Sequence, residues 1–100
     1  MEVGAKTVEK YWSVYMLRCA DGSLYTGVTT DPARRVAEHN GDRAGKGARY
    51  TRVRRPVQLV WQEFGHDRSS ALKREYALKK LRKADKEQLI KTYMSSIGDM

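Results

Sequence analysis

Residues 11–29 read YWSVYMLRCADGSLYTGVT, and this stretch decides the fold. Tyr11–Leu17 and Leu24–Thr29 are rich in aromatic and branched side chains, which favour β-strands. Between them, Ala20-Asp21-Gly22 is a turn sequence. We expect the two segments to pair as an antiparallel hairpin.

The length of the hairpin turn decides whether Tyr15 and Tyr25 share a face. A two-residue turn places the two rings on opposite faces, because a shift of one residue reverses every side chain. A three-residue turn with a left-handed Gly22 pairs Cys19 with Ser23 and places both rings on one face. We favour the second register, in which a glycine opposite Tyr15 leaves room for a phosphate or a water molecule. Taken alone, paired strand tyrosines are more often packing residues than catalysts.

Helix and strand signals continue after the hairpin. Asp31 can cap a helix that Pro32 begins and Asn40-Gly41 ends, with Ala33, Val36 and Ala37 facing the core. The later elements are a long loop over residues 41–55, a strand Val57–Phe64, a helix from Ser69 or Ser70 through Leu81, and a helix from Ala84 or Asp85 to about Met94. The order predicts an α+β fold, with a small three-stranded antiparallel sheet flanked by helices.

A chain of 100 residues is expected to form a single domain, here over residues 11–95, after a flexible leader at 1–10. No apolar run is long enough to cross a membrane. The lone Cys19 can form no internal disulfide, which favours a reducing cytoplasm.

The net charge of +8 is concentrated in two blocks. Residues 34–55 carry eight bases against two acids, and residues 68–91 carry nine bases against three acids. Such blocks favour a polyanionic partner, and arginine binds phosphate in bidentate fashion. An ordinary solvated surface explains the Lys-rich second block better than the Arg-rich first. The candidate nucleic-acid contacts are Arg34, Arg43, Lys46, Arg49, Tyr50, Arg52 and Arg54. Tyr50 can stack on an exposed base or simply pack the loop.

Arg35 and His39 are four residues apart and therefore share one face of the predicted helix. A guanidinium suits charge stabilisation on a phosphate, and an imidazole suits proton transfer. A random Arg or His on a helix is more often a surface residue. Two histidines and one cysteine also argue against a zinc site of the usual type.

Glu75 borders the apolar stripe of its predicted helix. It can pair with Lys79 one turn later, or it can ligate Mg²⁺, which often needs only one or two carboxylates. Position alone favours the ion pair.

The order of these motifs resembles the GIY-YIG nuclease superfamily. The matching residues are Val14-Tyr15, Tyr25-Thr26-Gly27, Arg35, His39-Asn40-Gly41 and the segment 72–77 around Glu75. The likeness covers roughly residues 11–81. Within the superfamily, the sequence is similar to the small stand-alone bacterial branch. It raises the expectation of a functional role for Tyr15, Tyr25, Arg35, His39 and Glu75.

The resemblance implies a metal-dependent endonuclease, with DNA favoured over RNA as its substrate. Glu75 would hold one Mg²⁺ or Mn²⁺, and Arg35 would stabilise the phosphate. His39 would assist proton movement, and either Tyr15 or Tyr25 would be the general base. A phenol has a pKa near ~10, so nearby positive charge must lower it for that role.

Ser13, Val14 and Thr26 depart from the family motif at supporting positions. Asn40 is the only asparagine, so a late asparagine used by some members is absent. No further target-selecting domain is seen, which favours branched, flapped or single-stranded DNA over a specific sequence. The alternatives are a non-catalytic nucleic-acid-binding module and a protein-interaction domain; the Arg-rich loop disfavours the latter.

Overall fold

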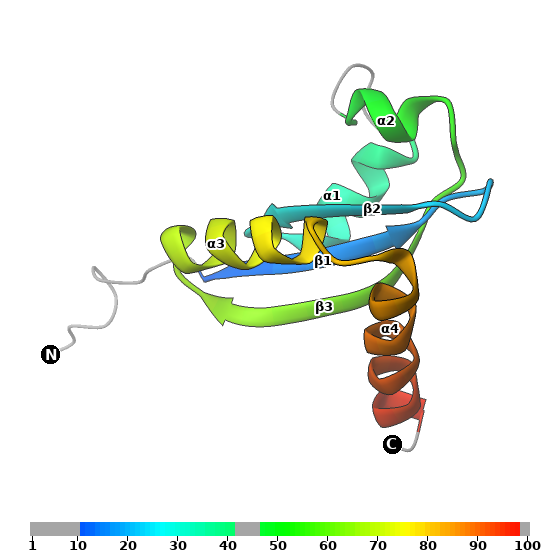
Figure 1. Ribbon diagram of the computed structural model, residues 1–100. Coiled ribbons are helices and arrows are strands. Elements are labelled where there is room, and N and C mark those ends of the chain that lie inside the picture. The colour runs from blue at the N-terminus through cyan, green and yellow to red at the C-terminus, as the bar shows by residue number, and fades with distance from the viewer. Residues whose placement is uncertain (1–10, 42–46, 99–100) are drawn as a thin grey trace, which may run out of the picture.

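The computed structural model describes residues 11–41 and 47–98. Its elements are β1 (Trp12–Arg18), β2 (Leu24–Thr29), α1 (Pro32–His39), α2 (Arg49–Arg52), β3 (Gln58–His66), α3 (Arg68–Lys79) and α4 (Lys83–Gly98) (Figure 1). The expected α+β class with a three-stranded antiparallel sheet is confirmed. The expected leader at 1–10 lies outside the described residues. Within the described residues, no helix is both long enough and apolar enough to span a lipid bilayer.

The strand order is β2-β1-β3, so β1 is the central strand and β2 is an outer strand. The hairpin turn has three residues: the Cys19 N–H donates to the Ser23 carbonyl at 2.9 Å, and Gly22 has a φ of 85°. Tyr15 consequently lies opposite Gly27, and Tyr25 lies opposite Leu17. The favoured register is confirmed, and both tyrosines occupy the same face of the sheet.

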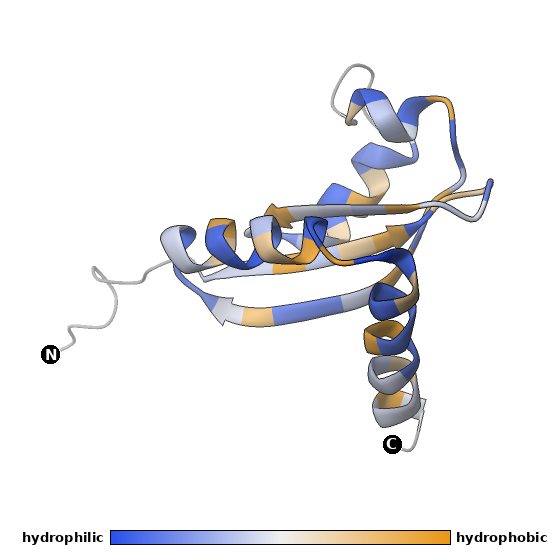
Figure 2. Cartoon of the chain, viewed as in Figure 1, coloured by the Kyte–Doolittle hydropathy of each residue, from blue (hydrophilic) through white to orange (hydrophobic). Residues whose placement is uncertain are grey.

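Each face of β1 contributes to a different apolar cluster. Val14 and Met16 pack with Trp61 of β3, Leu78 of α3 and Ile90 of α4. Figure 1 shows α3 lying along the sheet and α4 projecting away from it. The hydropathy colouring of Figure 2 shows apolar residues on both sheet and helices where they meet.

The opposite face of β1 carries Tyr15 and Leu17, which pack with Val57 in a smaller cluster. Val36 of α1 and Tyr25 of β2 pack against this cluster. The small core beneath α1 therefore contains a buried tyrosine, whose hydroxyl needs a polar partner.

Helix α1 begins and ends where the sequence predicts. The Asp31 side chain accepts from the Arg34 N–H at 3.2 Å, and Pro32 occupies the first turn. The Asn40 side chain both donates to the Val57 carbonyl (3.0 Å) and accepts from the Val57 N–H (2.6 Å). Asn40 therefore ties the end of α1 to the start of β3.

The inward face of α1 differs from the prediction. Ala33 is exposed, whereas Glu38 and His39 are buried. Charge and hydrogen bonding, rather than apolar packing alone, hold this helix against the sheet.

Several predicted boundaries also differ from the structure: the third strand continues to His66 rather than ending at Phe64, and α3 ends at Lys79 rather than Leu81. Residues 41–55 are not all loop, since α2 forms there and buries Thr51. Helix α3 is capped by Asp67, which accepts from the Ser70 N–H at 2.7 Å, because an ionised carboxylate is both an acceptor and a favourable charge at a helix N-terminus. Helix α4 begins at Lys83 and continues to Gly98.

Candidate active site

The Tyr15 ring lies over Gly27 of the neighbouring strand. A β-carbon at position 27 would lie 2.6 Å from the Tyr15 hydroxyl oxygen and 2.8 Å from its ring carbon Cζ. Any larger residue at position 27 would displace the phenol. Glycine is therefore required at this position for Tyr15 to occupy its observed place.

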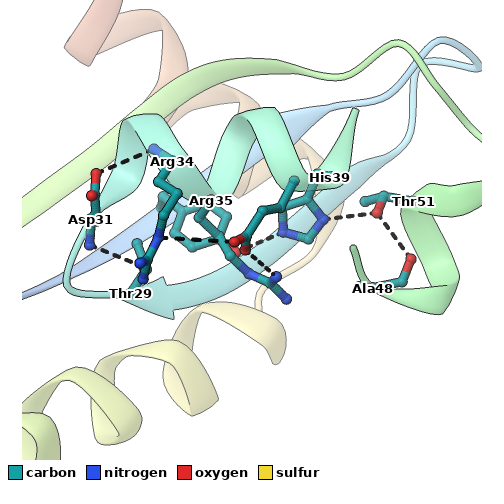
Figure 3. A network of polar contacts seen from close by, with 9 residues as sticks. Thr29, Asp31, Arg34, Arg35, His39, Ala48 and Thr51 are labelled. Carbon is teal, nitrogen blue, oxygen red and sulfur yellow. Dashed lines mark hydrogen bonds and ion pairs between the residues drawn. The ribbon is translucent and has the colours of Figure 1, made fainter. Parts of the chain in front are cut away.

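A buried chain of hydrogen bonds runs from Tyr15 through α1 to α2. The Tyr15 Oη lies 2.9 Å from Nε2 of His39, and Nδ1 of His39 lies 2.8 Å from Oγ1 of Thr51. The Thr51 hydroxyl donates to the Ala48 carbonyl at 3.1 Å (Figure 3). Tyr15, His39 and Thr51 are each at most 1% exposed.

This chain of contacts assigns the histidine tautomer. Because the Thr51 hydroxyl gives its proton to Ala48, its oxygen accepts from His39, so Nδ1 carries the hydrogen. Nε2 then presents a lone pair, and the Tyr15 hydroxyl donates to it. The structure thus positions an imidazole to receive the phenol proton.

The surroundings keep His39 neutral. Burial and the positive charges of Arg35 and Arg55 together lower its pKa to about 4, and the negative charge of Glu38 partly opposes them. At neutral pH the Nε2 lone pair is therefore available.

The Tyr15 phenol is also neutral in this environment. Burial raises its pKa above the usual range, and negative charge at Tyr25 and Glu75 adds to the effect. Arg35 opposes this rise through its charge and through a hydrogen bond to the phenol. A phenolate is thus disfavoured, and the neutral phenol donates a hydrogen bond to His39.

Arg35 is held beside the phenol by an acidic partner on the same helix. Its Nη1 donates to Oε1 of Glu38 at 3.0 Å, and Nε of Arg34 lies 3.9 Å from the other carboxylate oxygen (Figure 3). The Arg35 side chain is 28% exposed, so the guanidinium lies where solvent or a phosphate can meet it. Glu38 was not predicted as a site residue from the sequence. It orients Arg35, which was.

The Tyr25 ring covers the outer side of the Tyr15 and His39 rings. Its ring centroid lies 4.9 Å from that of His39 and 6.3 Å from that of Tyr15. On its other flank the Tyr50 ring lies 6.1 Å away at 24°. Tyr25 therefore links the buried chain to the surface aromatic residue of α2.

Glu75 of α3 belongs to the same region. Although α3 packs mainly on the opposite face, β2 is the outer strand, and the Glu75 charge is close enough to raise the pKa of Tyr15. Its side chain is 19% exposed and its carboxylate lies 3.1 Å from Nζ of Lys79. The ion pair considered from the sequence is present.

Glu75 has the chemistry of a lone carboxylate ligand for a hard cation. No group of three or more His, Cys, Asp or Glu side chains gathers into a metal cage within the described residues. Mg²⁺ keeps several waters and commonly takes one or two carboxylates together with substrate phosphates. A single, partly exposed carboxylate beside a basic surface fits that preference.

The predicted nucleic-acid contacts occupy different parts of the surface. Arg49 and Arg52 are exposed on α2. The Arg54 guanidinium carbon lies 3.9 Å from the Tyr50 ring centroid, and its Nε pairs with Asp21 at 3.1 Å. Arg34 lies beside Glu38, as described above. Arg43 and Lys46 lie outside the described residues.

Sequence reasoning missed Thr51 and Arg55. Arg55 donates from Nε to the His39 carbonyl at 2.7 Å and so braces the end of α1. Neither residue carries a periodic signal, because α2 has only four residues. The sequence signal for Thr51 was a hydroxyl residue placed among arginines in Arg49–Arg52.

Comparison with known proteins identifies the family that this chain resembles. The family model for the GIY-YIG catalytic domain matches residues 11–88. A UPF0213 protein of Desulfotalea psychrophila is 59% identical over 80 residues, covering 80% of this chain and 71% of that protein. A UPF0213 protein of Staphylococcus aureus is 53% identical over 78 residues, covering 78% and 92%.

Two solution NMR structures are also similar. A UPF0213 protein from Bacillus halodurans has a TM-score of 0.52 at 44% identity, covering 82% of this chain and 84% of that one. A protein from E. faecalis has a TM-score of 0.56 at 45% identity, covering 86% and 88%. With the family model matching most of its length, this chain belongs to the GIY-YIG family of nuclease domains.

Proposed function

We propose that this protein is a metal-dependent endonuclease that hydrolyses DNA phosphodiester bonds, selecting its target by structure rather than by sequence. The observation that carries the proposal is the buried Tyr15–His39 hydrogen bond beside Arg35. A neutral imidazole that accepts from a phenol is a proton acceptor, and packing alone does not require one.

In the proposed reaction Tyr15 is the general base. Its oxygen takes a proton from the attacking water as its own proton moves to Nε2 of His39. This relay avoids a free phenolate, which the raised pKa of Tyr15 disfavours. Tyr25 lies beside both rings and shields the proton path.

The positive charge of Arg35 has two roles in this proposal. It donates a hydrogen bond to the phenol oxygen, which stabilises the negative charge that develops there as the phenol loses its proton. It also stabilises charge that develops on the phosphate, because a guanidinium presents several donors to phosphate oxygens. Glu38 keeps the guanidinium in place for both.

Glu75 would hold the divalent cation, Mg²⁺ or Mn²⁺, of the kind that GIY-YIG nucleases generally use. When bound, such a cation polarises the scissile phosphate and neutralises charge on the leaving oxygen. Lys79 beside Glu75 adds a further positive charge to this region. Exposed arginines at positions 34, 49 and 52 would contact the DNA backbone, and we place the protein in the cytoplasm.

The test is a cleavage panel. Branched, flapped, single-stranded and supercoiled DNA are incubated with the protein and Mg²⁺ or Mn²⁺. We expect wild-type cleavage, and we expect Glu75→Gln to abolish cleavage while DNA binding persists. The matched control is Asp85→Asn, which removes the same charge from an exposed position on α4.

Two results would contradict the proposal. If Glu75→Gln cleaves DNA at the wild-type rate, Glu75 is not the metal ligand that the reaction needs. Salt-sensitive DNA binding without cleavage of any substrate in either metal would instead leave a nucleic-acid-binding module.

A further inference from the structure

A groove runs along the outer edge of β2, next to the candidate active site. It has a volume of about 240 Å³ and lies between α2 and the junction of α3 with α4. We call it the edge groove; its lining residues are Leu24, Tyr25, Thr26, Tyr50, Lys79 and Lys86. In the described part of the chain, β2 pairs only with β1, so its outer edge has no neighbouring strand.

The edge groove is continuous with the candidate active site through two residues. Tyr25 lines the groove and also packs 4.9 Å from the His39 ring. Lys79 lines the groove and also pairs with Glu75. Whatever occupies the groove therefore lies next to the proposed scissile phosphate.

One wall of the edge groove is aromatic and held firmly in place. The Tyr25 and Tyr50 rings are nearly parallel, at 24°, with centroids 6.1 Å apart. Arg54 lies over Tyr50, donates to the Tyr50 carbonyl at 2.9 Å and is anchored by Asp21. A wall that is ordered before binding loses little entropy when a ligand arrives.

The other wall is cationic. Lys79 and Lys86 both line the groove, and no acid lines it among the described residues. The nearby Glu87 is engaged by Arg18 at 2.7 Å, and no ion pair joins Lys86 to an acid in the part of the chain that the structure describes. Lys86 therefore offers its charge to a ligand.

We propose that the edge groove binds an unpaired nucleotide of single-stranded DNA, immediately next to the phosphate that is cut. The aromatic wall contacts the base and the lysines contact the backbone, which is how single strands are commonly recognised. A duplex keeps its bases stacked inside and offers only phosphates to such a groove. The inference rests on the proposed nuclease function and names its substrate as DNA with a single-stranded segment at the cleavage site.

Lys86 is the residue that tests this proposal most cleanly. Lys79 also pairs with Glu75, so its loss would alter the candidate metal site as well. The matched control for Lys86→Met is Lys91→Met, which removes the same charge from the same helix at an exposed position outside the groove. A second variant, Tyr50→Leu, alters the aromatic wall and keeps an apolar side chain.

The experiment measures fluorescence anisotropy with a labelled single strand and with the blunt duplex of the same sequence, in EDTA over a range of salt. We expect Lys86→Met to reduce the slope of log K against log salt for the single strand by about 0.7, the value for one lost phosphate contact. We expect Tyr50→Leu to weaken single-strand binding by about 5- to 150-fold, the range for one lost stacking contact. Duplex binding by Lys86→Met should match that by Lys91→Met, and duplex binding by Tyr50→Leu should match that by the wild type.

The outcomes separate the groove from the nuclease. The proposed groove site is overturned if Lys86→Met and Lys91→Met give equal salt slopes on the single strand. It is also overturned if the groove variants lose affinity for the single strand and for the duplex equally. Cleavage in Mg²⁺, measured in parallel on the wild type, tests the nuclease itself. The expected groove effects without any cleavage would overturn the endonuclease and keep the groove as a single-strand binding site.

Discussion

The phenol oxygen of Tyr15 lies 2.9 Å from Nε2 of His39, although the two residues are 24 positions apart in the sequence. One comes from the central strand and the other from the last turn of α1. Both are buried, and the hydroxyl of Thr51 determines which imidazole nitrogen faces the phenol. Tyr15 is thereby distinguished from Tyr25, which the sequence alone could not do.

The first prediction concerns this distinction between the tyrosines. Tyr15→Phe should lower the single-turnover cleavage rate by about 10²- to 10⁴-fold, the usual contribution of a general acid or base. It should also destabilise the fold by about 1–3 kcal/mol, because Nε2 of His39 loses its buried donor. Tyr25→Phe should cause a much smaller loss of rate. A larger loss in Tyr25→Phe would assign the base to Tyr25 instead, and equal losses would contradict the assignment to Tyr15 alone.

The hairpin and the first helix could be predicted from local signals. Gly22 permits the three-residue turn, and that turn places Tyr15 opposite Gly27. Asp31 and Pro32 begin α1 by the capping rules. These features depend on residues that are neighbours in the sequence, so one sequence is sufficient to predict them.

The partners of the site could not be predicted in the same way. Thr51 acts through a hydrogen bond to His39 that forms only after α1 and α2 pack together. Glu38 pairs with Arg35 at i,i+3 spacing on the same helix, but its burial depends on packing, and a buried Glu on a short helix contradicts ordinary expectation. Tertiary packing, rather than local propensity, determines this part of the site.

The second prediction concerns Thr51 as a positioning residue. Thr51→Val keeps the shape of the side chain but removes the acceptor for His39 Nδ1–H, so the imidazole loses its fixed tautomer. The cleavage rate should fall about tenfold or more, as is typical when a residue that orients a functional group is lost. Thr51→Ser restores the hydroxyl and should recover most of the rate.

Nitrogen-15 chemical shifts of the His39 ring provide the readout that a purely structural role would not change. We expect protonated Nδ1 in the wild type and in Thr51→Ser, and a mixture of tautomers in Thr51→Val. An unchanged tautomer in Thr51→Val, together with a reduced rate, would show that Thr51 acts by another route.

The third prediction concerns Gly27. Gly27→Ala places a β-carbon against the Tyr15 hydroxyl, so the ring must leave His39. Overpacking of this kind should cost about 1–3 kcal/mol of the free energy of unfolding and should remove most of the cleavage activity. The control is Gly98→Ala, where an added β-carbon meets nothing within 4 Å.

A double-mutant cycle makes the Gly27 prediction specific. In a Tyr15→Phe background the hydroxyl is already absent, so Gly27→Ala should destabilise the fold by less than it does alone. Additive losses would mean that the alanine disturbs the strand backbone and not the phenol.

The fourth prediction is a pH dependence of stability that arises from His39. Its pKa is about 4 in the folded protein, below the ordinary 6.5, mainly because of burial. The unfolded chain therefore binds the proton more readily, and acid favours unfolding between pH 6.5 and 4. The stabilisation is complete above pH 6.5 and decreases as the pH falls toward 4. By pH 5 the loss from this residue should be about 2 kcal/mol.

Urea unfolding of the wild type and of His39→Gln at pH 7.5 and pH 5 measures this effect. Near pH 5 most carboxylates remain ionised, so the wild type should lose about 2 kcal/mol more than the variant between the two pH values. His39→Gln should be less stable at pH 7.5, since glutamine cannot reproduce both ring contacts, and the difference should narrow at pH 5. If both proteins lose the same stability over this range, His39 is not held neutral by the fold, and the lone pair that the proposed relay needs is not secured.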